Sequence, residues 1–306
     1  MQYSLLGDSA INASRIALGV MRIADKTREE AASIVGTALD HGINFFDTAD
    51  IYGAGKSSAV LGCAFHDLGI NREDVVVQTK VGVVCGQRYD FSRQHIVESL
   101  EQELTRLRTE YVDLLVLHRP DVLVDLDELA ETFTALQQQG KVRCSGVSNM
   151  SPRQVDLLQS VLVQKLEVNQ LQFGLCHAGM VRHEIHVNMG EPSESGDDDG
   201  LLSYSRLHHM TIQAWSPFQC PQLGASFIDH PQLAKLNDVL RRIASEHGVS
   251  SSAVAAAWIL RHPAGIQVLV GTMNPIHLGD ITAAADITLD RQEWYDLYCA
   301  AGNDLP

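Results

Sequence analysis

The chain has 306 residues, which suits one large domain or two ordinary ones, and 45% hydrophobic and 20% charged residues are typical of a globular protein. A net charge of −15 and a pI near 5.2 argue against binding to nucleic acid, which needs a basic surface. The chain has no membrane-length apolar run, no recognisable signal peptide and no CxxC pair among its six cysteines, so we expect a cytoplasmic protein with reduced thiols.

Short apolar runs rich in Val, Ile and Leu recur along the chain and predict strands that are buried on both faces of a parallel sheet. They lie at 15–20, 43–47, 74–80, 111–118, 142–148, 166–170, 210–215 and 266–271. Helical patterns follow at 27–41, 92–108, 125–139, 151–160, 231–247, 251–261 and 290–299. Start signals such as Ser151 before Pro152, and stop signals such as Gly140, mark the ends of these helices.

Alternating strands and helices favour either a closed barrel or an open doubly wound sheet. No GxGxxG motif follows the first predicted strand, which counts against the doubly wound dinucleotide-binding fold. A barrel of eight strand–helix units needs roughly 250 residues, which leaves room here for a long loop and a tail. We therefore predict an α/β protein with one domain over 1–306, a (β/α)8 TIM barrel with a long loop at 174–200, after strand six, and a C-terminal helix.

Polar groups follow the predicted strands at their carboxyl ends. In a barrel all of these positions surround one mouth, where active sites are built. Packing alone does not explain why so many apolar runs end in a polar group at the same face. The residues at these ends are Asp47, Lys80, His118, Ser148, Asn149, Asn169, Gln170, Trp215, Ser216, Gly271 and Thr272.

Four of the residues near this mouth form a set that suits carbonyl reduction. Hydride transfer to a carbonyl carbon leaves charge on the oxygen, which a proton must then neutralise. Tyr52 is a poor acid at neutral pH, and a nearby Lys80 cation would lower its pKa by favouring the phenolate. Asp47 would hold Lys80 in place, and His118 would donate a hydrogen bond to the carbonyl and orient it. Each residue alone is ordinary as a cap, a packing group or a solvated side chain, but together they indicate a catalytic site.

Motifs along nearly the whole chain resemble those of the aldo-keto reductase family, in its bacterial oxidoreductase branch. They are GVMRIAD (19–25), FFDTADIYG (45–53), TK (79–80), DLLVLHRPD (113–121), GVSN (146–149), EVNQ (167–170), AWSP (214–217) and GTMNP (271–275). The resemblance implies an oxidoreductase that uses NADPH to reduce a small aldehyde or ketone to an alcohol. It also implies that Tyr52 is the proton donor, that Lys80 and Asp47 tune it, and that His118 orients the substrate.

The resemblance also implies a cofactor site. Ser148, Asn149 and Gln170 would bind the nicotinamide carboxamide, and Trp215 would stack its ring on the nicotinamide. The GTMNP turn opens a helix whose amides would hold a phosphate. The remaining residues expected at the cofactor are Gly19, Met21, Asp47, Ser216, Pro217, Leu223, Gly271, Thr272, Met273, His277 and Asp280.

The cofactor site departs from the family pattern at one position. His277 occupies the place where the family commonly has an arginine that reads the 2′-phosphate of NADPH, and Asp280 lies nearby. A neutral histidine supplies less charge than arginine, and Asp280 would suit the unphosphorylated ribose of NADH. We therefore expect NADPH as the cofactor, with NADH as the alternative.

Other interpretations remain open at this point. The same fold can serve as a cofactor-binding regulatory or sensor protein with little turnover. His183 and His186 suggest a zinc hydrolase, although they lack the HExxH spacing, and we expect no metal. Cys220 is either a redox-sensitive or an idle thiol. The acidic run at 197–199 is expected to be a solvated loop tip. The loop at 174–200 and the tail are expected to shape the substrate pocket. The oligomeric state and natural substrate are not indicated.

Overall fold

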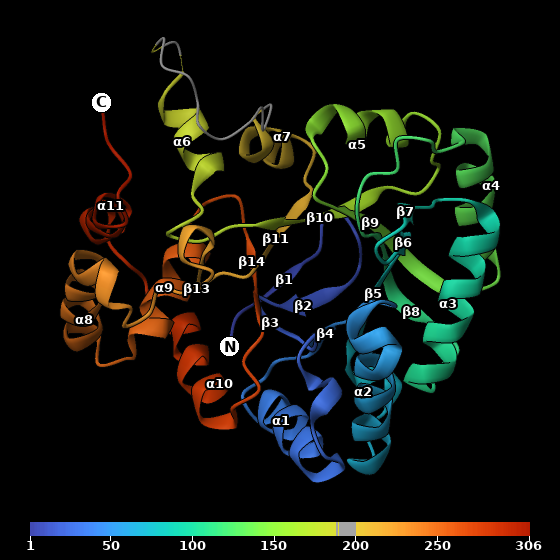
Figure 1. Cartoon of the computed structure of the whole chain (residues 1–306), viewed down its shortest axis with the longest axis horizontal. Helices are drawn as coiled ribbons and strands as arrows, with labels where there is room; N and C mark the ends of the chain where they lie inside the picture. Colours follow the sequence, from blue (N-terminus) through green and yellow to red (C-terminus); the bar gives the residue numbers. More distant parts are fainter. Residues whose placement is uncertain (188, 190–199) are drawn as a thin grey trace.

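Eight parallel strands close into a barrel at the centre of the protein, for which we have a computed structural model that describes residues 1–187, 189 and 200–306 (Figure 1). Strand β14 pairs with β3 through Leu269 and Ala17, which closes the sheet. The barrel strands are β3 (Ile16–Gly19), β4 (Phe45–Asp47), β5 (Val76–Val81), β8 (Val112–Leu117), β9 (Val142–Ser148), β10 (Leu166–Gln172), β11 (Thr211–Trp215) and β14 (Gln267–Val270). The predicted (β/α)8 barrel is confirmed.

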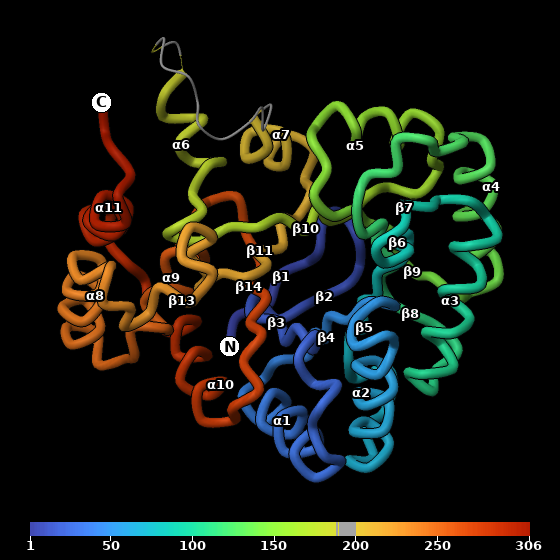
Figure 2. The backbone as a smooth tube through the Cα atoms, viewed as in Figure 1, coloured from blue at the N-terminus to red at the C-terminus, as the bar shows by residue number. Residues whose placement is uncertain are grey.

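Helices surround the strands on the outside of the barrel (Figures 1 and 2). The predicted helices are found within a few residues of the expected bounds, as α1 (Arg28–Asp40), α3 (Arg93–Leu107), α4 (Leu126–Gln138), α5 (Pro152–Gln159), α8 (Ala234–His247), α9 (Ser251–Leu260) and α11 (Arg291–Ala300). Helix α10 (Pro275–Thr282) follows the GTMNP turn as expected. The sequence interpretation missed α2 (Lys56–Asp67), α6 (Gly179–Ile185) and α7 (Leu201–Leu207).

Capping side chains fix where several of these helices begin. Thr27, Ser151 and Asp290 each accept a hydrogen bond from a backbone N–H of the first turn, and the side chain of the third helical residue accepts one from the backbone N–H of the cap in return. These capping boxes satisfy backbone groups that the helix itself leaves without partners. Each cap therefore fixes the residue at which its helix begins.

A hairpin of β1 (Tyr3–Leu5) and β2 (Asn12–Ser14) covers the opposite end of the barrel. The backbone of its turn donates hydrogen bonds to Thr211 and Glu167, which lie at the amino ends of β11 and β10. Leu6 from this turn is buried among inward-facing residues of the barrel, which include Phe45. Two further hairpins join β6 (Val83–Val84) to β7 (Arg88–Tyr89), and β12 (Gln219–Cys220) to β13 (Ala225–Ser226).

The segment expected to be a loop at 174–200 contains helix α6, so that expectation is wrong for residues 179–185. Residues 188 and 190–199, which include the acidic run at 197–199, lie outside the described residues. Helix α7 begins directly after them. Within the described ranges, no helix has the length and apolar character needed to cross a membrane.

Candidate active site

A cavity of about 1060 Å³ opens at the carboxyl ends of the barrel strands. Most of the residues predicted for the site line it, and they come from distant parts of the sequence. The predicted residues in its lining are Gly19, Met21, Asp47, Tyr52, His118, Ser148, Asn149, Gln170, Trp215, Ser216, Pro217, Gly271, Thr272, Met273, His277 and Asp280. The barrel thus brings the strand-end groups to one place.

Two predicted residues do not line the cavity. Lys80 is fully buried and contacts the site through Tyr52 and Asp47. Leu223 belongs to a single turn at Pro221–Leu223, between β12 and β13, and packs against the hydrophobic core instead. Its expected place at the cofactor stays a prediction. Within the described part of the chain, neither the segment at 174–200 nor the tail contributes to the lining, contrary to expectation.

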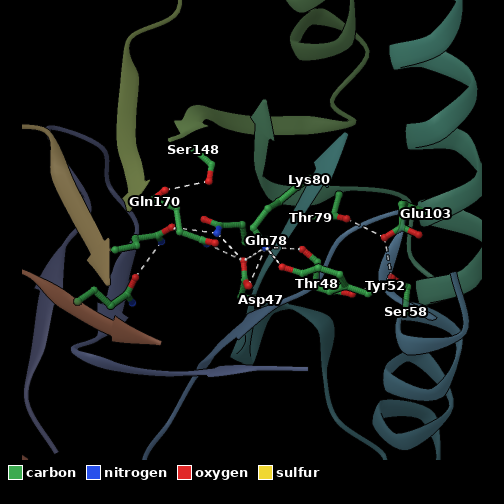
Figure 3. Close-up of polar contacts among 12 residues, drawn as sticks. Asp47, Thr48, Tyr52, Ser58, Gln78, Thr79, Lys80, Glu103, Ser148 and Gln170 are labelled. Atoms are coloured by element: carbon green, nitrogen blue, oxygen red, sulfur yellow. Dashed lines mark hydrogen bonds and ion pairs between the residues drawn. The ribbon is translucent and has the colours of Figure 1, made fainter. Parts of the chain in front are cut away.

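An ammonium, a carboxylate and a phenol meet at the floor of the cavity (Figure 3). The Lys80 ammonium lies 2.7 Å from the Asp47 carboxylate and donates to the carbonyl oxygen of Thr48 at 2.9 Å. It also donates to the Tyr52 hydroxyl at 3.2 Å. Because Lys80 has no exposed surface, this pairing is what allows its charge to be buried.

A tight turn after β4 brings Tyr52 back over the strand ends. The backbone of Gly53, Ala54 and Gly55 is left-handed, with φ of 56°, 54° and 87°. Glycine adopts this conformation at little cost, and a side chain at Gly53 would also collide with Ala24. The sequence YGAG therefore ends the strand segment sharply and starts helix α2 with Tyr52 facing the cavity.

The pKa of Tyr52 lies above its ordinary value, because burial of the phenol outweighs the lowering effect of Lys80. The expected net lowering of this pKa is therefore wrong for the ligand-free protein, although Lys80 does act in that direction. For Lys80 itself, burial disfavours the charge, but Asp47 and Tyr52 prevail and raise its pKa. Both shifts favour a protonated phenol beside a charged ammonium.

His118 faces Tyr52 across the cavity as a neutral ring. Their ring centroids lie 5.8 Å apart, edge to face. Burial, together with the charges of Lys80 and Arg119, lowers the pKa of His118 to about 3. Its Nδ1 atom is buried and has no hydrogen-bond partner among the described residues. A neutral imidazole carries one N–H, which is suited to donate to an uncharged oxygen.

Polar groups from three neighbouring strands form one side of the cavity. The Ser148 hydroxyl donates to the carbonyl oxygen of Gln170 at 2.8 Å and accepts from the Asn149 amide at 2.7 Å. The Trp215 indole donates to Asn149 at 3.2 Å, which fixes the half-buried ring beside these amides. A flat aromatic face next to amide groups suits a planar heterocycle that carries a carboxamide.

A chain of amides extends from the site through the barrel interior. Gln78 and Gln170 each donate to Asp47, at 2.6 and 3.0 Å, and to Gln213, at 2.9 and 3.3 Å. Gln213 donates to Gln267 at 2.8 Å, and Gln267 donates to the carbonyl oxygen of Ser14. Gln78, Gln213 and Gln267 were missed as parts of the site because none of them lies at the carboxyl end of its strand.

The far end of the cavity contains the starts of two helices. Asn274 caps α10, and Ser250 caps α9, so the free backbone amides of both helices face this region. His277 and Asp280 are exposed here. Among the lining residues that sequence reasoning missed are Arg22, Lys26, Ser250 and Ser252. Arg22 lies within the MRIAD stretch and Lys26 directly follows it, and their positive charges were a signal that could have been used.

The described residues contain no group of three or more His, Cys, Asp and Glu side chains that could hold a metal ion. Of the two histidines considered for zinc, His186 lies 3.6 Å from Asp304. Cys220 is buried and lies 3.3 Å from Gln222. Burial, together with Cys220, raises the pKa of the neighbouring Cys176 thiol to about 12.

Comparison with known proteins matches this geometry to one family. The sequence model described as "Aldo/keto reductase family" matches residues 15–298. A protein of Agrobacterium fabrum named 6-dehydroglucose reductase is 34% identical over 98% of both chains, and the oxidoreductase YdhF of Escherichia coli is 33% identical over 96% of this chain and 95% of its own. A crystal structure of an aldo-keto reductase from Klebsiella pneumoniae in complex with NADPH superimposes with a TM-score of 0.76 at 25% identity, covering 95% of this chain and 92% of that one. The chain belongs to the aldo/keto reductase family.

Proposed function

We propose that this protein reduces a small aldehyde or ketone to an alcohol with hydride from NADPH, and that Tyr52 supplies the proton. The observation that carries this proposal is the contact of the Lys80 ammonium with the Tyr52 hydroxyl at 3.2 Å, at the floor of the cavity. Membership of the family supports the reaction class, and the NADPH complex of the Klebsiella relative supports the cofactor.

The residues of the cavity fit such a cofactor. The Trp215 ring and the amide of Asn149 would hold the nicotinamide and its carboxamide, and the starts of α9 and α10 would hold phosphate groups. Arg22 and Lys26 line the cavity and supply positive charge there, whereas His277 supplies less charge than an arginine would. This local charge matters because the net charge of −15 on the whole molecule repels anions. When bound, NADPH supplies the hydride.

The proton step follows from the electrostatics of the floor. As charge develops on the carbonyl oxygen, Tyr52 donates its proton, and the phenolate that remains is stabilised by the Lys80 ammonium. Asp47 keeps Lys80 charged and in place. Neutral His118 donates its N–H to the carbonyl oxygen and holds it within reach of Tyr52. We place this reaction in the cytoplasm, a location that the six free cysteines support.

The test compares the purified protein with Tyr52→Phe, using a panel of aldehydes and ketones and following NADPH absorbance. A positioned general acid typically contributes at least about 100-fold to rate, so we expect kcat to fall by at least that factor. The affinity for NADPH, measured by quenching of tryptophan fluorescence, should stay within about twofold of the wild-type value, because phenylalanine keeps a ring of similar shape.

A matched control is Tyr111→Phe, at the amino end of β8. The Tyr111 hydroxyl is buried without a hydrogen-bond partner in the described part of the chain, and its ring lies between Arg72 and Arg143. Its removal should leave kcat unchanged. Near-full activity of Tyr52→Phe would show that Tyr52 is not the proton donor. Tight NADPH binding without turnover of any carbonyl would favour the regulatory alternative.

A further inference from the structure

A fully buried carboxylate lies behind the candidate active site, outside the cavity. Glu103 on α3 has no exposed surface, and a buried carboxylate is costly unless several donors satisfy it. Its Oε2 atom accepts from the Ser58 hydroxyl at 2.6 Å and from the Thr79 hydroxyl at 2.7 Å. Its Oε1 atom accepts from the Arg106 guanidinium at 3.1 Å. Each of these donors lies next to, or contacts, a segment that carries a residue of the site.

The two hydroxyls connect Glu103 to the segments that carry Lys80 and Tyr52 (Figure 3). Thr79 directly precedes Lys80 on β5, so one bond fixes that strand against α3. Ser58 lies in the first turn of α2, directly after the turn that carries Tyr52. The Ser58 hydroxyl also lies 2.9 Å from that of Thr48, whose carbonyl oxygen accepts from Lys80.

Arg106 adds a third connection to the same turn. While it is held by Glu103, its guanidinium donates to the carbonyl oxygen of Asp50 at 3.4 Å. It also packs so closely against Gly55 that a Cβ atom there would collide with it. The turn that presents Tyr52 is therefore attached to α3 at both of its ends, through one carboxylate and the arginine that it holds.

We propose that Glu103 is a positioning residue that sets the contact between the Lys80 ammonium and the Tyr52 hydroxyl. It acts by anchoring β5 and the 48–58 segment to the same point on α3, without touching substrate or cofactor. This inference rests on the proposed function, because it assigns Glu103 to the proton step of that reaction. The buried carboxylate then serves to fix the positions of Lys80 and Tyr52 in the site.

The charge of Glu103 also reaches the turn. Burial and the neighbouring Glu103 carboxylate raise the pKa of Asp50 to about 7, and the Asp50 Oδ1 atom has no partner among the described residues. The other groups near this carboxyl are the Ser99 hydroxyl and the Arg106 guanidinium. Removal of the charge at position 103 therefore lowers the pKa of Asp50, which is opposite in direction to the change expected for Tyr52.

The test is Glu103→Gln, which keeps the shape of the side chain but removes its charge and weakens its acceptors. Small displacements of reacting groups cost up to about 100-fold, so we expect kcat to fall by about 10-fold or more. The KM for carbonyl substrate and the Kd for NADPH should stay within about twofold, because Glu103 is absent from the cavity lining.

The pKa of Tyr52 is the readout that a purely structural role would not move. A longer contact with Lys80 weakens the hydrogen bond that lowers this pKa, so the ionisation of Tyr52 should move to higher pH. It is measured as the difference in phenolate absorbance between each protein and its Tyr52→Phe counterpart, and needs no turnover. The substitution leaves intact the charged and titratable groups that face Tyr52, which are Lys80, Asp47, His118 and Arg119.

The matched control is Glu167→Gln, since Glu167 is also a buried carboxyl but accepts from the backbone of Asp8 at the opposite end of the barrel. It should change neither kcat nor the ionisation of Tyr52. If Glu103→Gln fails to fold, Thr79→Val removes one bond to Glu103 and should give a smaller change in the same directions.

An unchanged Tyr52 ionisation in Glu103→Gln, or a loss of kcat that only follows the unfolded fraction, would overturn the positioning role. That failure is distinct from failure of the proposed function, which the wild-type protein and Tyr52→Phe decide separately. An upward shift of the Tyr52 pKa, together with reduced kcat and unchanged KM, supports the proposal.

Discussion

His118 illustrates how burial decides the chemical role of a single residue. Burial and two neighbouring cations lower its pKa to about 3, so at about pH 5 only about 1% of the rings carry a second proton. We therefore expect that protonation of His118 does not lower kcat above about pH 5. Titration of the ring by NMR, assigned with His118→Gln, checks this, and a midpoint near 6.5 would contradict it.

At the scale of residues, strand-end positions were predictable and interior ones were not. Asp47 and His118 end apolar runs, so their convergence follows from barrel geometry alone. Glu103 reads in the sequence as an ordinary helix residue, and its partners Ser58 and Thr79 lie 45 and 24 positions away. Only the packing of α2, α3 and β5 against one another makes it part of a network. The net pKa of Tyr52 was missed for a similar reason, because burial is set by the whole cavity wall.

Helix α11 is joined to α9 by a reciprocal pair of tryptophans. Each indole N–H of Trp258 and Trp294 donates to the backbone carbonyl oxygen of the other residue at 3.0 Å. Their rings stack with centroids 4.9 Å apart, and the Tyr298 ring stacks on Trp294 at 5.8 Å. This arrangement attaches the C-terminal helix to α9.

We expect Trp294→Ala to lower the free energy of unfolding by about 3 kcal/mol, the lower end for loss of a large aromatic side chain, because Trp294 is only half-buried. Urea denaturation measures this change. Trp294→Phe keeps a ring but loses the hydrogen bond, and should cost about 1 kcal/mol. NADPH affinity should be unchanged in both variants, since α11 contributes no described residue to the cavity lining. Weakened NADPH binding would show that α11 supports the site.

At the scale of elements, the helices that the sequence missed share a physical feature. Helices α2, α6 and α7 have Gly55, Ala178 and Gly200 at the N-cap position, and none of these residues provides a side-chain cap. Helices with Ser, Thr or Asp caps, such as α5 after Ser151, were found within a few residues of their bounds. Without a start signal, a short helix cannot be told from a connection, so the segment at 174–200 was interpreted as a loop.

The whole molecule should respond to NADPH through linkage between binding and folding. At about 100 times its Kd, a ligand that binds only the folded state adds about 2.7 kcal/mol of stability. For a chain of this size, that corresponds to a rise in Tm of several degrees, since about 1 kcal/mol shifts Tm by about 2–4 °C. A thermal-shift titration measures this rise.

The same titration with NADH tests the cofactor preference. We expect a higher concentration of NADH than of NADPH to be needed for the same rise in Tm, because Arg22 and Lys26 favour the more highly charged cofactor. An equal response would show that His277 and Asp280 remove the preference. No shift with either cofactor would contradict the proposed cofactor site.

The barrel as a whole was predictable, because its strands and helices alternate with clear periodicity over most of the chain. The hairpin of β1 and β2, which closes the other end, was not, since two strands of three residues carry too little apolar pattern to be recognised. Its role depends on Leu6 entering the barrel, which is a property of the assembled molecule.

The amides inside the barrel give the molecule a polarity that no single strand possesses. Asp47 only accepts, so Gln78 and Gln170 must turn their N–H groups toward it, and Gln213 must then offer its oxygen to both. That choice sends the N–H of Gln213 to Gln267, and the N–H of Gln267 to the carbonyl oxygen of Ser14. One negative charge at the mouth thus orients a row of dipoles that extends to the covered end of the barrel. From Gln78 and Gln170 onward, donation runs away from the mouth, and this orientation is set by Asp47, which also holds the ammonium of Lys80.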